Sequence, residues 1–196
     1  MKLRTSLGSV LALTALACAA PAGATTFTYT TSLSGSIESP PNASPGAGLA
    51  IVTIDDSSFM MRVQTAFFDL LGNVTASHIH CCTAAPGTGT AGVATVTPTF
   101  TGFPLGVTSG TYDHTFDLTD AGSWNLAFIT AHGGTPGGAE AALLAGLAAG
   151  EAYLNIHSTF RPGGEIRGFL VVPEPGSLAL LGVALAGIAF VRRRGS

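Results

Sequence analysis

Hydrophobic and polar residues alternate along most of the chain, and this two-residue period predicts β-strands. In the longest run, 59–71, the side chains of Met61, Val63 and Phe67 fall on one face of the predicted strand. Clusters of glycine, proline, asparagine and aspartate separate the runs and predict tight turns. The predicted strands are 27–33, 49–54, 59–71, 74–80, 92–97, 111–118, 152–158 and 165–172.

The period changes at 138–149, where small and apolar residues predict a helix of about three turns that ends at Gly150. Two segments are ambiguous. Residues 100–105 form a further strand if Pro104 does not interrupt it, and 124–130 is either a strand or an irregular segment. Eight to ten short strands with one helical insertion predict an all-β fold, an antiparallel sandwich or a Greek-key barrel.

The first 24 residues have the three parts of a secretory signal peptide. Lys2 and Arg4 give a positive start, 7–20 is apolar, and 22–24 reads Ala-Gly-Ala. We therefore expect cleavage between Ala24 and Thr25. Cys18 raises the alternative of a lipoprotein, but the position three residues before it is not a large aliphatic residue.

The last residues, 173–196, form a second address segment. Residues 177–191 carry no charge and would span about 22 Å as a helix, which is short of a bilayer core of about 30 Å. A short apolar span before a basic cluster fits retention at the inner membrane with the body outside the cytoplasm. The motif residues are Pro173, Glu174, Pro175, Arg192, Arg193 and Arg194.

This tail resembles the PEP-CTERM sorting signal of Gram-negative bacteria that make extracellular polysaccharide. The resemblance implies that an exosortase recognises the tail at the inner membrane and removes it at the Pro-Glu-Pro motif. Delivery to the cell envelope surface or the extracellular matrix would follow. The alternative is an ordinary C-terminal transmembrane helix that is never processed.

The body between the two address segments, 25–172, is acidic. It contains three arginines, no lysine and ten acidic residues, a formal charge of −7. Such a surface excludes nucleic acid and anionic membranes as partners. Its length predicts one domain, and its only cysteines are Cys81 and Cys82, so no disulfide can join distant segments.

Three segments of the body carry a second resemblance. They are Ser-His-Ile-His at 77–80, the segment 150–158, and Pro-Gly-Gly-Glu-Ile-Arg-Gly at 162–168. In this order they resemble the CHRD domain of chordin and of bacterial secreted proteins, although Ser158 stands where threonine is usual. The resemblance implies an immunoglobulin-like or related β-sandwich without established catalytic activity. The motif residues are Tyr153, Asn155, His157, Gly164, Glu165, Ile166, Arg167 and Gly168.

Histidines at alternate positions suggest a metal site. His78, His80 and Cys82 share one face of the predicted strand 74–80 if it continues, and His157 lies on a face of strand 152–158. If these strands pair, three imidazoles with Cys82 nearby would suit Cu or Zn. The alternative is that the histidines are polar surface or hold backbone groups beneath a loop.

The adjacent Cys81 and Cys82 leave several alternatives open: a vicinal disulfide, a bridge to another chain, or thiolate metal ligands. A vicinal disulfide fits an oxidising compartment best. Arg167 is expected to form a structural ion pair with Glu165 or a neighbouring aspartate.

No catalytic motif is present in the sequence. The chain is therefore predicted to be an exported, non-enzymatic structural or binding module associated with exopolysaccharide, or with another secreted protein. A copper or zinc metalloprotein is the alternative.

Overall fold

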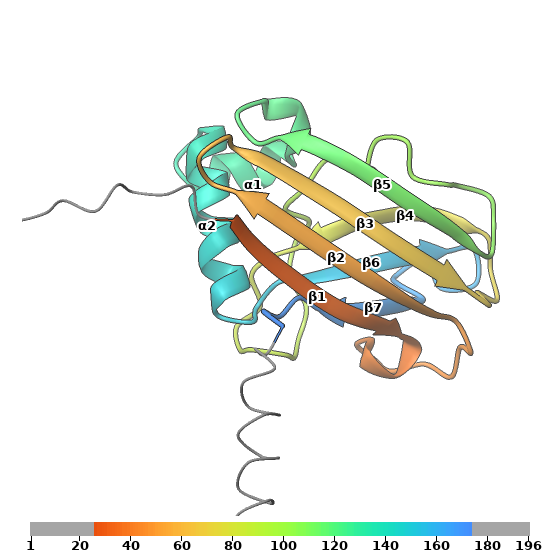
Figure 1. Cartoon of the computed structure of the whole chain (residues 1–196). Coiled ribbons are helices and arrows are strands. Elements are labelled where there is room, and N and C mark those ends of the chain that lie inside the picture. Colours follow the sequence, from red (N-terminus) through yellow and green to blue (C-terminus); the bar gives the residue numbers. More distant parts are fainter. Residues whose placement is uncertain (1–25, 174–196) are drawn as a thin grey trace, which may run out of the picture.

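The computed structural model describes residues 26–173, and the predicted signal peptide and the sorting tail after Pro173 lie outside these residues (Figure 1). Within 26–173, no helix is long and apolar enough to cross a membrane. The strands are β1 (Thr26–Ser34), β2 (Ala47–Asp55), β3 (Met60–Phe68), β4 (Val74–His80), β5 (Gly110–Asp117), β6 (Tyr153–Ser158) and β7 (Ile166–Phe169). The helices are α1 (Leu126–Ala131), α2 (Pro136–Ala148) and two short 3-10 turns, η1 (Gly35–Ile37) and η2 (Ala121–Ser123).

All seven strands form one antiparallel sheet in the order β4-β6-β7-β1-β2-β3-β5. The sheet curls, so that the part made of β1, β2, β3 and β5 lies in front of the part made of β4, β6 and β7 in Figure 1. The two parts join where Ser34 of β1 pairs with Arg167 of β7. The predicted all-β antiparallel fold is confirmed, and the curled sheet is consistent with a β-sandwich.

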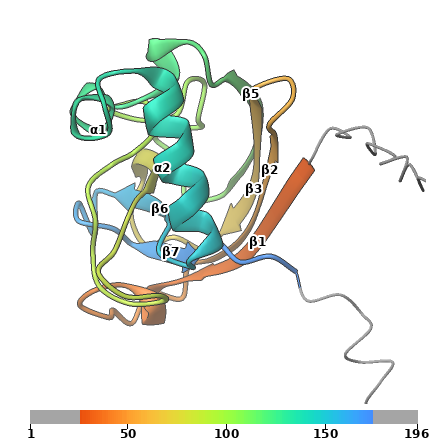
Figure 2. The same cartoon turned by 90° about the vertical axis from the view of Figure 1, so that its left-hand side faces the viewer.

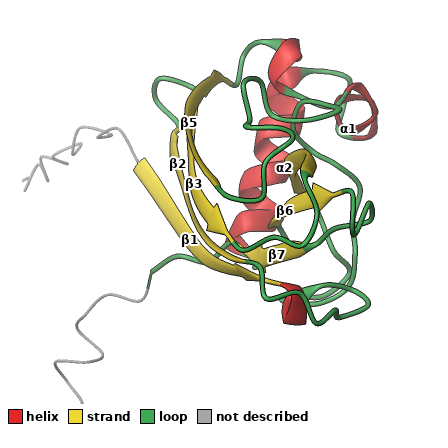
Figure 3. Ribbon diagram, turned by 90° about the vertical axis from the view of Figure 1, so that its right-hand side faces the viewer, coloured by secondary structure: helices red, strands yellow, loops and turns green. Residues whose placement is uncertain are grey.

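The core lies inside the curl and follows from the alternation of the sequence. Val52, Ile54, Met61 and Val63 are fully buried, because alternate residues of β2 and β3 face inward. Helix α2 covers one side of the core, as Figures 2 and 3 show from opposite directions. Its buried residues include Ala139, Leu143 and Leu147.

The ambiguous segment 124–130 is mostly helical, as α1. The Asn125 side chain accepts a hydrogen bond from the backbone N–H of Ala127, which caps the helix start. Helix α2 begins two residues before the predicted helix, because Pro136 suits the first helical position and the Thr135 hydroxyl accepts from Gly138 N–H. Beyond its end Gly150 has a φ of +71°.

The predicted strand 92–97 is irregular instead, and so is 100–105, which was a strand only if Pro104 did not interrupt it. Their backbone does follow the outer edge of β4, since Ala94 N–H donates to Ile79 O at 2.9 Å and Phe100 N–H donates to Ser77 O at 2.8 Å. The backbone N–H groups of Ser77 and Ile79 donate to the hydroxyls of Thr99 and Thr95, at 2.9 and 3.0 Å. Threonine side chains therefore accept the hydrogen bonds that backbone carbonyls would accept in a regular pair of strands.

Candidate metal centre

The pairing of β4 with β6 brings three histidines to one face of the sheet. His78 pairs with Asn155, His80 with Tyr153, and Ala76 with His157. Directly paired residues share a face, so His157 lies diagonally beside His78. Ile79, Leu154 and Ile156 point to the opposite face and are fully buried in the core. The histidine face is therefore the outer face of this part of the sheet.

The three imidazoles form a compact cluster. The ring centroid of His78 lies 4.7 Å from that of His80 and 4.7 Å from that of His157. One ligand nitrogen from each ring lies within 4.8 Å of the others. His78 and His80 are only 6% and 9% exposed. Within residues 26–173, this is the one group of His, Cys, Asp and Glu side chains arranged to hold a metal ion.

Backbone carbonyls fix the orientation of two rings. His80 Nδ1 lies 2.8 Å from Ala91 O, and His157 Nδ1 lies 2.8 Å from Pro162 O. A carbonyl can only accept, so Nδ1 carries the proton in both rings and Nε2 keeps its lone pair. Neither Nε2 atom has a hydrogen-bond partner. This is the arrangement by which proteins orient histidine ligands toward a metal.

His78 has no such anchor. Neither of its ring nitrogens makes a hydrogen bond of normal geometry, although the nearby Pro98 carbonyl opposes the fall in its pKa. The four buried ring nitrogens without partners are Nδ1 and Nε2 of His78 and Nε2 of His80 and His157. Buried polar atoms are normally hydrogen-bonded, so such a group requires an explanation.

All three imidazoles are neutral at ordinary pH. Burial, followed by the neighbouring His157 and His80, lowers the pKa of His78 to about 3. Burial also lowers the pKa of His80 to about 4 and lowers the pKa of His157. Neutral imidazole is the form that binds a metal, so the cluster needs no deprotonation before it does so.

A stack of side chains continues from the cluster along the sheet. The ring of Tyr153 is parallel to that of His80, with 4.7 Å between centroids. The guanidinium carbon of Arg167 in turn lies 4.6 Å from the centroid of the Tyr153 ring. Of the CHRD motif residues, Tyr153 therefore contacts the histidine centre directly, and Arg167 contacts it through the Tyr153 ring.

The sequence predicted that Arg167 pairs with Glu165 or a neighbouring aspartate, but the acid beside it is Glu38, with 3.8 Å between Arg167 Nε and the carboxylate. Arg167 Nε also donates to Ile37 O at 2.7 Å, and its Nη1 donates to Gly89 O at 2.8 Å. Burial raises the pKa of Glu38 to about 7, and Arg167 opposes that rise. Glu38 follows η1 in a loop far from Arg167 in sequence, and no pattern in the sequence pointed to it.

Glu165 instead holds three loops together. Its carboxylate accepts from Ser44 Oγ at 2.6 Å, from Leu71 N–H at 2.6 Å and from Gly72 N–H at 3.2 Å. It also accepts from Ser158 Oγ. Burial raises its pKa, but these four hydrogen bonds outweigh burial and the pKa is lowered. Glu165 is thus a structural residue with no part in the cluster.

The remaining motif residues support the scaffold. Ile166 is fully buried. Gly168 lies so close to Thr31 and the Ser32 carbonyl of β1 that a Cβ would overlap them. Gly164 has a φ of +130° and faces the Asn155 amide and the Glu38 carboxylate, so both its conformation and its space require glycine.

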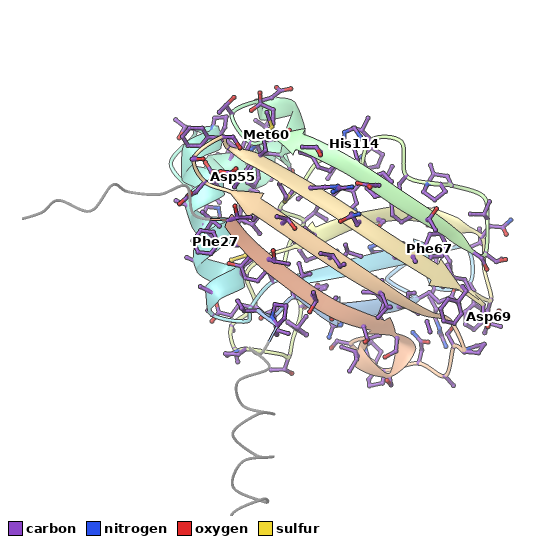
Figure 4. The ribbon with its side chains drawn as sticks, in the orientation of Figure 1. Phe27, Asp55, Met60, Phe67, Asp69 and His114 are labelled. Carbon is purple, nitrogen blue, oxygen red and sulfur yellow. A yellow bond between two sulfur atoms is a disulfide. The ribbon has the colours of Figure 1, made fainter. Side chains whose placement is uncertain are left out.

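Cys81 and Cys82 form a disulfide. Both sulfurs lie against Gly146 of α2, where a Cβ would overlap them. Cys82 is therefore not among the three clustered side chains, although the alternation of β4 placed it with them. His114, labelled on β5 in Figure 4, is also outside the cluster. Its ring neighbours those of Tyr112 and Phe116.

Comparison with known proteins supports the motifs found in the sequence. The CHRD domain family model matches residues 29–170, and the model of the PEP-CTERM protein-sorting motif matches residues 171–194. No curated protein and no solved structure gives a significant match. The sorting motif implies export, sorting to the envelope of a Gram-negative bacterium and processing by an exosortase. The chain therefore belongs to the CHRD domain family and carries a PEP-CTERM sorting motif.

Proposed function

We propose that this exported CHRD domain is a metal-binding protein whose His78, His80 and His157 bind one copper or zinc ion. The observation that carries the proposal is the set of three neutral imidazoles with unpaired Nε2 atoms and ligand nitrogens within 4.8 Å of one another. Two nitrogens bound to one ion lie at most about 4 Å apart, so ring movements of about 1 Å complete the site.

A scaffolding role for the histidines explains these observations less well. His80 and His157 each hold a backbone carbonyl through Nδ1, but a purely scaffolding role does not explain why the four other buried ring nitrogens make no hydrogen bond of normal geometry. A polar surface would leave the rings hydrated, whereas His78 is 6% exposed. Three imidazole ligands suit copper and zinc among the common metals. An additional ligand would come from water or from another molecule.

The proposed domain organisation is a signal peptide at 1–24, the metal-binding domain at 25–172 and the sorting segment at 173–196. Export would place the centre outside the cytoplasm, at the envelope surface or in the extracellular matrix. A structural or binding role among exopolysaccharide, or with another secreted protein, stays a prediction, because it rests on the family and sorting motifs alone.

The test is the metal content of the full chain, purified from the envelope without a histidine tag. Elemental mass spectrometry should find about one Cu or Zn per chain in the wild type. The variant H78A/H80A/H157A should lose the ion, while the control H114A, which changes a histidine outside the cluster, should keep it. Sub-stoichiometric metal that is unchanged in the triple variant would overturn the proposal.

A further inference from the structure

The donor set of the histidine centre contains no negative charge. The three ligands are neutral imidazoles, and in the described part of the chain no Asp, Glu or Cys joins the group. Cys82 is bound to Cys81 as a disulfide and so supplies no thiolate. A bound ion therefore keeps its full charge inside the site.

Burial makes that charge costly. His78 and His80 are nearly inaccessible, and the cost of moving an ion out of water rises with the square of its charge. A divalent ion pays about four times the desolvation of a monovalent ion of similar size. Zinc sites with three histidines and divalent copper sites normally recover this cost from an anionic ligand or from water.

A fixed positive charge adds to the cost. The Arg167 guanidinium is separated from His80 by the single ring of Tyr153, with steps of 4.6 and 4.7 Å. Arg167 is 3% exposed, so water screens it poorly.

Glu38 offsets this field only in part. Its carboxylate lies 3.8 Å from Arg167 Nε. The raised pKa of Glu38, about 7, leaves its carboxyl partly protonated near neutral pH. An extra unit charge about 10 Å from Arg167, at an effective dielectric constant of about 20, lowers affinity on the order of ten-fold.

We propose that the histidine centre binds copper as the monovalent ion, in preference to divalent copper or zinc. This inference rests on the proposed metal-binding function. Arg167 acts as a selectivity residue: it touches Tyr153 and not the ion, and it disfavours each additional unit of positive charge at the site. Three neutral nitrogen donors with no required anion are sufficient for a monovalent copper ion.

The test compares affinities of the metal-free full chain for Cu(I), Cu(II) and Zn(II), each measured against a competing chelator, with Cu(I) handled without oxygen. We expect one Cu(I) per chain, bound at least ten-fold more tightly than Zn(II) or Cu(II), and no such site in H78A/H80A/H157A. In R167Q the ratio of the affinity for Cu(I) to that for Zn(II) or Cu(II) should fall on the order of ten-fold. R167K keeps the positive charge and should retain the wild-type ratio.

The outcomes separate the two proposals. Zn(II) or Cu(II) bound at the histidines as tightly as Cu(I) would overturn the preference and leave the metal centre standing. If none of the three ions binds at the histidines, both proposals are wrong. If R167Q does not fold, the ratio of wild-type affinities for Cu(I) and for the divalent ions still decides whether the preference exists.

Discussion

Replacing Glu165 with glutamine tests the assignment of this residue as the link between three loops. The carboxylate accepts four hydrogen bonds, two at each oxygen: Ser44 Oγ and Leu71 N–H at one, and Ser158 Oγ and Gly72 N–H at the other. In E165Q one oxygen becomes an NH₂ group. The hydroxyl on that side can turn and accept, but the backbone N–H cannot.

The expected cost follows from this count. One buried N–H left without an acceptor costs about 1–3 kcal/mol, and the remaining bonds weaken because they are no longer charge-assisted. We therefore expect E165Q to lower the free energy of unfolding by about 3 kcal/mol, a large part of the ~5–15 kcal/mol typical of a domain.

Urea denaturation of the two proteins at pH 7 measures the difference. E151Q is the matched control, since Glu151 is only partly buried and its side chain lies outside the Glu165 network. The lowered pKa of Glu165 adds a second readout: its stabilising effect is present above the unfolded value near 4.5 and is lost as the pH falls through the folded pKa. The gap between wild type and E165Q should therefore close in acid. A loss in E165Q no larger than in E151Q would refute the assignment.

Three further outcomes are expected. Lowering the pH from 7.5 to 5 should destabilise the metal-free protein by about 2 kcal/mol for each of His78 and His80, because their folded pKa values are about 3 and about 4 while the unfolded imidazoles titrate near 6.5. Urea titrations at the two pH values should show a smaller loss of stability in H78Q/H80Q than in the wild type. An equal loss in the two proteins would contradict the neutral cluster. G146A should destabilise by about 1–3 kcal/mol, because its Cβ would overlap the disulfide sulfurs. G137A, in the same helix with open space around the position, should be neutral or slightly stabilising, and thermal denaturation of both variants checks the contrast. R62Q should leave the urea midpoint unchanged, because the Arg62–Asp113 pair is about half exposed; a clear shift would show that exposed pairs matter in this fold.

Short-range pattern predicted a strand at each of the seven strands of the structure, although it also predicted one at 92–97, and it predicted which histidines share a strand face. The alternation of 74–80 and 152–158 predicted the strand face of His78, His80 and His157, because strand geometry fixes which way each side chain points. The pairing of β4 with β6 was stated only as a condition, since it joins segments far apart in the chain. The motif of 164–168 identified Glu165 and Arg167 but not their partners.

The sequence did not reveal the hydrogen-bond and ion-pair partners of the site residues, because these partners come from loops, several of them distant in sequence. Glu38 reaches Arg167 from an irregular loop, and the Ala91 and Pro162 carbonyls that orient the histidines belong to loops as well. Backbone carbonyls leave no mark in a sequence pattern. The segment 92–105 misled the strand prediction because threonine hydroxyls, and not backbone carbonyls, accept from Ser77 and Ile79.

The threonine hydroxyls on the outer edge of β4 have a consequence for how the exported protein survives outside the cytoplasm. An edge strand normally offers a row of free backbone groups to which another chain can add, and secreted proteins have no cytoplasmic chaperones to prevent this. Here the edge amides of Ser77 and Ile79 are already occupied by Thr99 and Thr95. The strand that carries two of the histidines is thereby closed to cross-chain pairing, and its edge amides should exchange hydrogen with solvent as slowly as those of an interior strand.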